Sequence, residues 1–343
     1  MKRRTIFFCS FVFFLFTLGL KSSEKQLKLL GKFGGMDVHE QQFLNNPVDI
    51  AVSKEGEIYI LDSRDNDIKV FKKEGTFIKC MGREGSGPGE FKRPWMLGLI
   101  EDKIYVADTG NRRIQVLSKN GEYLRSFRVP IDYGQGMTID SKGNLCLNTQ
   151  GLKSPKLISV YNNEGNFLKE IGNLEGESIQ FYDISRIKNQ IRKGEIPDNF
   201  KNDILLDFDK TGNLFAVHLA LNKFKKLSPE GESICTIEIK AEEYQKIYNA
   251  FRKRNDEIAD LPFAYYPLAY INDLAVDKQG SLYILLNEPS RMIIYLFSNS
   301  GEFKGRLLGV DDAIVRMAIS DDNIIYAISS ETHFIYKFAL NIE

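Results

Sequence analysis

The chain has 343 residues, 43% of them hydrophobic, and its 46 basic residues balance 46 acidic residues. This length and apolar content are sufficient for one large core, and therefore for a single large domain. The balanced charge gives no electrostatic support for a nucleic-acid partner.

The N-terminus predicts export. Three basic residues at positions 2–4 precede an uncharged run over residues 5–20 that is rich in Phe and Leu. A basic region followed by an apolar region is typical of a secretory signal peptide. We expect residues 1–20 to be a signal peptide, cleaved after Gly19, or an uncleaved membrane anchor. The expected location is therefore extracytoplasmic, either periplasmic or secreted, with membrane anchoring as the second option.

A repeated glycine turn organises the remaining chain. Five times, an apolar residue at the end of a strand-like run is followed four positions later by glycine, at Phe71/Gly75, Leu117/Gly121, Tyr161/Gly165, Leu227/Gly231 and Phe297/Gly301. Each glycine closes a hairpin turn such as KKEG or SKNG. The glycines are separated by 46, 44, 66 and 70 residues. This spacing indicates a unit of about 45 residues, as in a propeller blade, with two enlarged connections.

Each unit contains four short strands. In the first unit, polar turns separate apolar or alternating runs at residues 48–52, 57–61, 67–71 and 76–80. Equivalent sets of strands begin near positions 95, 136, 204 and 273. A sixth set begins at position 313 and lacks its fourth strand.

An N-terminal strand can complete the sixth unit. Residues 26–34 (QLKLLGKFG) precede the first unit and have the pattern of an outer strand. Closing the ring in this way leaves no open sheet edge at the last blade. We therefore predict an all-β fold, a six-bladed β-propeller of four-stranded blades that occupies residues 26–343.

Two units resemble a known repeat. The connector GREGSGPGEFKRP (82–94) and the strands KIYVADTGNRRIQVLSKNGEYLRSF (103–127) resemble the NHL repeat, with its G-x-G-x-F-x-x-P connector, aspartate-initiated turn and N-x-R-I step. Residues 43–80 are a weaker copy, in which Asp67 stands where the repeat has arginine. The whole chain is also similar to six-bladed propeller proteins exported by bacteria. The resemblance implies the propeller fold and leaves the activity open.

The two enlarged connections define a candidate functional face. Residues 173–202 lie between blades 3 and 4, and residues 240–270 lie between blades 4 and 5. Connections between blades leave an up-and-down propeller on the same face as the loops between second and third strands. Long loops on a rigid scaffold are the usual place for binding. We predict a helix over residues 241–259 and a second helix over residues 185–194.

Aromatic side chains after the predicted 241–259 helix are the first ligand-binding candidates. Tyr265 and Tyr266 lie in the segment FAYYPLAY (263–270) at the start of blade 5. Such rings can stack on a sugar ring, a peptide side chain or a flat ligand. The alternative is that they fill the space beneath the helix.

Charged residues on the innermost strands are the second group of candidates. Asp49, Asp273 and Arg316 occupy equivalent positions in blades 1, 5 and 6, which are neighbours in the closed ring. We expect them side by side near the channel mouth, with Asp207 of blade 4 also pointing inward. They form either a ligand-binding group or a structural acid–base–acid network that joins the first and last blades.

The aspartate-initiated turns contain the third group. Asp62 and Asp108 are expected to accept backbone N–H bonds within their own turns. Arg112 and Arg113 of the DTGNRR segment are expected to be exposed, and they are further ligand-binding candidates.

We favour an exported, non-catalytic and monomeric scaffold that binds a peptide, glycan or protein partner on the face with the insertions, without a cofactor. The three histidines form no HxH or HxxxH pair, and no serine or cysteine nucleophile motif occurs, so we identify no catalytic or metal-binding residue. The alternative is a divalent-cation-dependent enzyme, lactonase-like or lyase-like, that uses Asp49, Asp207 and Asp273. Gluconolactonase-like propellers hold a divalent cation with channel carboxylates and amides, and under this alternative the three aspartates form an oxygen site for calcium or magnesium.

Overall fold

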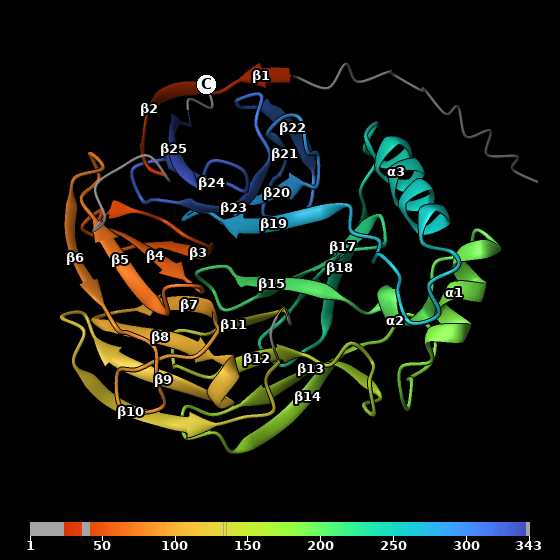
Figure 1. The fold of residues 1–343 in the computed structure, drawn as a ribbon, viewed down its shortest axis with the longest axis horizontal. Helices are drawn as coiled ribbons and strands as arrows, with labels where there is room; N and C mark the ends of the chain where they lie inside the picture. The colour runs from red at the N-terminus through yellow and green to blue at the C-terminus, as the bar shows by residue number, and fades with distance from the viewer. Residues whose placement is uncertain (1–23, 36–41, 133, 135, 341–343) are drawn as a thin grey trace, which may run out of the picture.

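The computed structural model describes residues 24–35, 42–132, 134 and 136–340. Six separate sheets stand in a ring around a central channel (Figure 1). This arrangement confirms the predicted six-bladed β-propeller. The signal peptide predicted for residues 1–20 and the histidine at position 39 lie outside the described residues.

Each blade runs from an inner strand at the channel to an outer strand at the rim. Blade 1 contains β3 (Pro47–Val52), β4 (Ile58–Asp62), β5 (Asp67–Phe71) and β6 (Phe77–Met81). Blade 2 contains β7 (Pro94–Ile100), β8 (Lys103–Asp108), β9 (Arg113–Ser118) and β10 (Tyr123–Arg128). Blade 3 contains β11 (Met137–Ile139), β12 (Leu145–Asn148), β13 (Lys156–Tyr161) and β14 (Phe167–Asn173).

The second half of the ring continues the same order. Blade 4 contains β15 (Ile204–Phe208), β16 (Leu214–His218), β17 (Lys223–Leu227) and β18 (Ser233–Glu238). Blade 5 contains β19 (Ile271–Val276), β20 (Leu282–Leu286), β21 (Ile293–Phe297) and β22 (Phe303–Leu308). The chain of blade 6 supplies β23 (Ile314–Ile319), β24 (Ile324–Ser329) and β25 (Phe334–Ala339).

The core lies between the blades. The second and third strands are buried on both sides, as in the all-buried β4 and β20. Their side chains form apolar clusters that each combine two neighbouring blades, for example Ile60 and Phe71 of blade 1 with Tyr326 of blade 6. Burial on both faces explains why the second strands are largely continuous apolar runs, while the outer strands alternate.

The glycine turns connect each blade to the preceding one. The five repeated glycines have φ angles between 86° and 96°, a region that favours glycine. A Cβ atom at Gly231 would also lie 2.5 Å from Ile171 of the preceding outer strand. Equivalent contacts pair Gly75 with Phe33, Gly121 with Met81, Gly165 with Phe127, and Gly301 with Ile237. The repeat therefore serves both the turn and the packing of neighbouring blades.

The N-terminal segment closes the ring in two steps. Strand β2 (Lys28–Gly34) pairs antiparallel with β25 and completes blade 6, which confirms the predicted closure. Strand β1 (Glu24–Gln26) pairs parallel with β22 and adds a fifth strand to blade 5. The prediction that Gln26 begins the closing strand is therefore wrong, because Gln26 belongs to blade 5.

The two insertions form helices beside blades 4 and 5 (Figure 1). The first contains α1 (Ile184–Arg192) and α2 (Asp198–Lys201), and the second contains α3 (Tyr244–Glu257). Buried residues of all three helices share an apolar cluster with blades 4 and 5. Both predicted helices are confirmed, although α3 is shorter than expected at each end. Within the described residues, no helix has the length and apolarity needed to cross a membrane.

Candidate functional site

Four charged residues of the inner strands face one cavity. The central channel contains a cavity of about 430 Å³ that residues of all six inner strands line. Asp49, Asp207, Asp273 and Arg316 all contribute to its wall. The structure therefore brings together the four channel residues that were selected from the sequence.

Irregular pairing directs three of these side chains. In β3, β19 and β23, the register with the second strand shifts directly before Asp49, Asp273 and Arg316. A β-bulge of this kind bends a strand and changes the direction of the next side chain. A fourth shift in β7 precedes Met96, the equivalent residue of blade 2.

Each aspartate joins its own inner strand to the next one. The Oδ2 atom of each carboxylate accepts a backbone N–H bond across the gap between two blades. Asp49 accepts from Leu97 at 2.6 Å, Asp207 accepts from Val276 at 3.0 Å, and Asp273 accepts from Met317 at 2.7 Å. The other oxygens of Asp49 and Asp207 accept the N–H of the following residue, at 2.9 Å and 2.8 Å. Because neighbouring blades are separate sheets, these side chains provide the hydrogen bonds that their inner strands do not exchange.

Arg316 connects three blades through carbonyl groups. Its Nε atom donates to Val48 of blade 1 at 2.8 Å, and its guanidinium also donates to Asn272 of blade 5 at 3.1 Å and to Val315 at 2.9 Å. The guanidinium carbon lies 5.1 Å from the centre of the Trp95 ring. Among the described residues, no carboxylate forms a direct ion pair with Arg316, so the expected acid–base–acid contact is replaced by bonds to carbonyls.

Burial raises the pKa of all three channel aspartates. Desolvation raises the pKa of Asp49 to about 7 and that of Asp273 to about 6, although the positive charge of Arg316 opposes both shifts. Desolvation also raises the pKa of Asp207 to about 7, against hydrogen bonds from Phe208 and Val276. Near neutral pH, the channel therefore contains both protonated and ionised carboxyl groups.

Most oxygens of the channel carboxylates are already engaged in hydrogen bonds, which weakens the case for a calcium ion. Calcium takes roughly six to eight oxygen ligands. Both carboxylate oxygens of Asp49 and Asp207 already accept backbone N–H bonds. In the part of the chain that the structure describes, no group of three His, Cys, Asp or Glu side chains could hold a metal ion.

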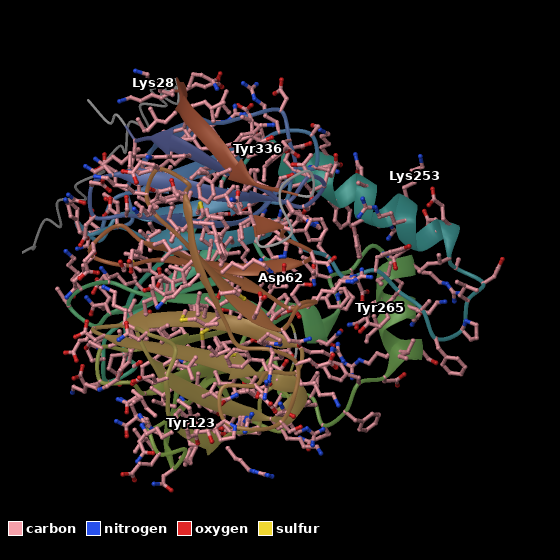
Figure 2. The ribbon with its side chains drawn as sticks, turned by 60° about the vertical axis from the view of Figure 1, so that its left-hand side comes forward. Lys28, Asp62, Tyr123, Lys253, Tyr265 and Tyr336 are labelled. Atoms are coloured by element: carbon pink, nitrogen blue, oxygen red, sulfur yellow. The ribbon has the colours of Figure 1, made fainter. Side chains whose placement is uncertain are left out.

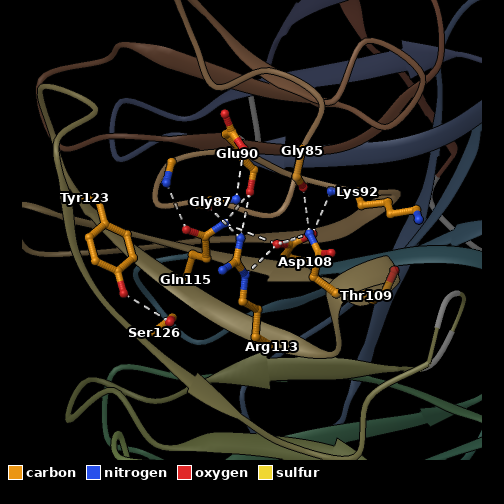
Figure 3. Close-up of polar contacts among 12 residues, drawn as sticks. Gly85, Gly87, Glu90, Lys92, Asp108, Thr109, Arg113, Gln115, Tyr123 and Ser126 are labelled. Carbon is orange, nitrogen blue, oxygen red and sulfur yellow. Dashed lines mark hydrogen bonds and ion pairs between the residues drawn. The ribbon is translucent and has the colours of Figure 1, made fainter.

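The turn at Asp108 is the centre of a polar network (Figure 3). Its carboxylate accepts from the Lys92 N–H at 2.7 Å, from Arg113 Nε at 2.8 Å and from Gln115 Nε2 at 3.2 Å. Arg113 also donates to the carbonyls of Gly87 and Glu90. The network ties the glycine-rich connector to blade 2.

These contacts correct two predictions. Arg113 is half-buried and ion-paired with Asp108, so its prediction as an exposed residue is wrong. Arg112 is exposed, with a left-handed backbone at a φ of 51°. Asp62 accepts from the N–H groups of Arg64 and Asp65 in its own turn, as expected, whereas Asp108 uses the connector and side chains instead.

The two tyrosine candidates occupy different environments, and Figure 2 shows Tyr265 beside the insertion helices. Tyr265 is half-buried, packs on the apolar cluster of blades 4 and 5, and has its ring centre 5.7 Å from that of Phe200. Tyr266 is 44% exposed. Tyr265 therefore fills space beside the helices, and Tyr266 presents its ring to solvent.

The family profile described as a six-bladed beta-propeller matches residues 39–256, which is more than half of the chain. The chain belongs to this family, DUF5128.

This DUF5128 propeller is similar to curated proteins over part of its length, and one of them is named as an NHL repeat-containing protein. It is 28% identical over 158 residues to Protein brain tumor of Drosophila melanogaster, which covers 44% of this chain and 15% of that protein. It is 34% identical over 105 residues to human NHL repeat-containing protein 3, which covers 29% of this chain and 30% of that protein. The chain thus spans less than a third of either relative.

Solved structures share the fold of this DUF5128 propeller at low identity. A member of the DUF4221 family from Bacteroides vulgatus has a TM-score of 0.57 at 11% identity, covering 91% of this chain and 97% of that one. A streptogramin B lyase has a TM-score of 0.50 at 14% identity, covering 85% and 78%. These likenesses show the architecture alone.

The structure also reveals polar contacts that sequence reasoning missed. The Tyr182 hydroxyl donates to Gln150 Oε1 at 2.6 Å, and Gln150 Nε2 donates to Asp203 Oδ1 at 3.3 Å. The three residues come from the first insertion, a loop of blade 3 and the start of blade 4. No short sequence motif contains these three residues. Gln150 has a positive φ of 55°, but a backbone angle of this kind cannot be read from the sequence.

Proposed function

We propose that this protein is an exported, non-catalytic propeller that binds a peptide, glycan or protein partner on the face with the two insertions. The proposal rests on the distribution of exposed apolar side chains. It places binding at the insertions and a structural role at the channel.

The distribution of large exposed hydrophobic residues carries the proposal. Among the described residues, most of them lie on outer strands at the rim. The others all belong to the two insertions, and they are Phe181, Tyr182, Leu261, Phe263 and Tyr266. Phe263 is 83% exposed and Phe181 is 70% exposed. Such aromatic groups on a rigid support are typical of a binding surface.

Contacts between the insertions make that support rigid. The Tyr248 hydroxyl of α3 donates to the Gly194 carbonyl after α1, at 3.0 Å. Lys188 of α1 donates to the carbonyl of Ala259 at 3.0 Å, and Arg252 of α3 donates to that of Ile191. Two connections that are far apart in the sequence therefore hold each other in place.

Site-specific photo-crosslinking in the native host tests this proposal. A benzophenone amino acid replaces Phe263 on the second insertion or, as the matched control, Phe167 on the outer strand of blade 3. Phe167 is also exposed, at 57%. We expect one discrete adduct from position 263 and none from position 167. Adducts of equal yield from both positions, or none from either, would contradict a binding face at the insertions.

The proposed location rests on the basic and apolar N-terminal segment. Fractionation of host cells, combined with protease treatment of spheroplasts, should place the protein outside the cytoplasmic membrane. Protein that is protected in intact spheroplasts would contradict export and leave the binding proposal unaffected.

The cation-dependent enzyme is the second candidate. One observation favours it, since three carboxylates share the channel cavity. Calorimetric titration of the purified protein with Ca²⁺ separates the candidates. The binding proposal expects no saturable calcium binding, and a stoichiometric site that the Asp49→Asn substitution abolishes would favour the enzyme.

A further inference from the structure

The first insertion encloses a cavity of its own. It has a volume of about 480 Å³ and lies between the segment 176–182, helix α1 and helix α2. This volume is within the range of about 300 to 1,000 Å³ that is usual for sites of small ligands. The cavity is separate from the channel, because the two share no lining residue.

One buried polar atom at this cavity is without a partner. Asn199 of α2 lines the cavity, and only 9% of its surface is exposed. Its Oδ1 atom is buried and accepts no hydrogen bond from any described residue. A buried acceptor without a donor is unfavourable, so a turn of the Asn199 side chain that brings Oδ1 into the cavity, where a ligand can donate to it, is favoured.

The basic groups at the cavity are already paired with a carboxylate. Asp198 forms ion pairs with Arg186 at 2.6 Å and with Lys201 at 2.7 Å. Asp183 caps α1 by accepting the Arg186 N–H at 3.0 Å. Glu177 adds a further carboxylate to the exposed lining. The carboxylates and the unpaired acceptor disfavour an anionic ligand. Because Arg186 and Lys201 are already paired with Asp198, neither requires a charged ligand.

Aromatic and planar polar groups complete the wall. Phe181 and Tyr182 are exposed beside the cavity, and Gln190 presents an amide that is held in place by Asp198. An aromatic face stacks on the C–H face of a sugar ring, and amide groups bind its hydroxyls. We propose that this cavity binds a neutral carbohydrate, with a ring hydroxyl that donates to Asn199 Oδ1 and a ring face that packs on Phe181. This inference rests on the proposed binding function and names its ligand class.

Binding to defined oligosaccharides tests the inference on the whole protein. An array presents neutral oligosaccharides of hexoses and N-acetylhexosamines beside sulfated and uronic-acid oligosaccharides. Calorimetry then measures the affinity of the protein for the probe that binds best. We expect neutral probes to bind, and the Asn199→Leu and Phe181→Ala substitutions to weaken binding at least tenfold. Asn189→Leu on the exposed side of α1 and Phe167→Ala on the outer strand of blade 3 are the matched controls, and both should leave the affinity unchanged.

The outcomes separate this inference from the proposed function. Because Phe181 is 70% exposed, Phe181→Ala tests the site even if Asn199→Leu unfolds α2. No binding at millimolar concentration, binding of charged probes alone, or equal losses in the control variants would each overturn the carbohydrate site. If crosslinking at position 263 persists in those cases, the binding face stands and its ligand belongs to another class.

Discussion

Blade 1 compensates for the charge that departs from the NHL pattern. In blade 2, Arg113 lies opposite Asp108 in the strand ladder and pairs with it. Blade 1 has Asp67 at the position of Arg113, and its cation is Lys69, two residues later. Lys69 Nζ lies 2.9 Å from Asp67 and 2.7 Å from Asp65, and its side chain is only 4% exposed. Burial alone would lower the pKa of Lys69, but these carboxylates outweigh it and raise the pKa.

The Lys69→Gln substitution should destabilise the protein by about 3 to 5 kcal/mol, because breaking a buried ion pair leaves uncompensated charges. Urea unfolding measures the change, with the exposed Lys54→Gln as the control. Adding Asp67→Arg to Lys69→Gln recreates the arrangement of blade 2 and should recover at least half of the loss. A double variant no more stable than the single one would contradict the compensation.

Asp207 should make stability depend on pH. Its pKa is raised from an ordinary 3.8 to about 7, so the folded protein holds this proton more tightly than the unfolded chain. Its contribution is then fully present below about pH 4 and is lost as the pH rises through about 7. Asp207→Asn cannot ionise and keeps one of the two acceptor oxygens, so we expect its melting temperature relative to the parent to be a few degrees higher at pH 8 than at pH 5.

Thermal unfolding at both pH values checks this expectation. The exposed Asp102→Asn substitution serves as the control and should show no such difference between the two pH values. A melting-temperature difference between Asp207→Asn and the parent that is the same at pH 5 and pH 8 would contradict the raised pKa of Asp207.

At the level of elements, the N-terminal strands connect the ring closure to the second insertion. Arg306 of β22 lies 3.4 Å from Glu24 of β1, and its other amino group lies 2.5 Å from Glu243 at the start of α3. The hydroxyl of Tyr295 donates to the same Glu243 at 2.8 Å. The outer edge of blade 5 therefore holds both the closing segment and the helix of the proposed binding face.

Truncation separates the roles of the two closing strands. A chain that begins at residue 27 lacks β1 and should retain cooperative unfolding, because it loses only three paired residues. A chain that begins at residue 36 also lacks β2 and leaves the edge of β25 open, so we expect aggregation or loss of the cooperative transition. A chain that begins at residue 22 is the reference. Equal melting temperatures for all three would contradict closure by β2.

Local patterns made most elements predictable. The glycine turns and buried second strands are short-range signals, and the missing sixth outer strand pointed to residues 26–34. Strand β1 escaped prediction because its three residues, EKQ, have no alternation and depend on a parallel partner some 280 positions away. Lys69 and Arg316 show that the contacts of individual side chains are equally hard to predict. Their positions were visible in the sequence, but their partners, three carboxylates and three carbonyls, are determined only by the folded ring.

For the whole molecule, substitution of Arg316 tests which contacts hold the six blades together. It donates to carbonyls of blades 5, 6 and 1, so Arg316→Ala should leave three acceptors without this donor. We expect a loss of about 2 to 3 kcal/mol in the free energy of unfolding. The exposed Arg112→Ala should change it by less than about 0.5 kcal/mol. An Arg316→Ala variant with parental stability but impaired partner binding would move the functional site into the channel.

The two-step closure also constrains the order of events during synthesis. Strands β1 and β2 leave the ribosome before the other described strands, but their partners β22 and β25 belong to blades 5 and 6. Blades 1 to 4 can pair their own strands as they emerge, whereas the ring cannot close until β25 has been made. The growing chain therefore carries unpaired strand edges throughout its translation. If the protein crosses a membrane from its N-terminal end, strands β1 and β2 cross before the last blade and remain unpaired until that blade has also crossed.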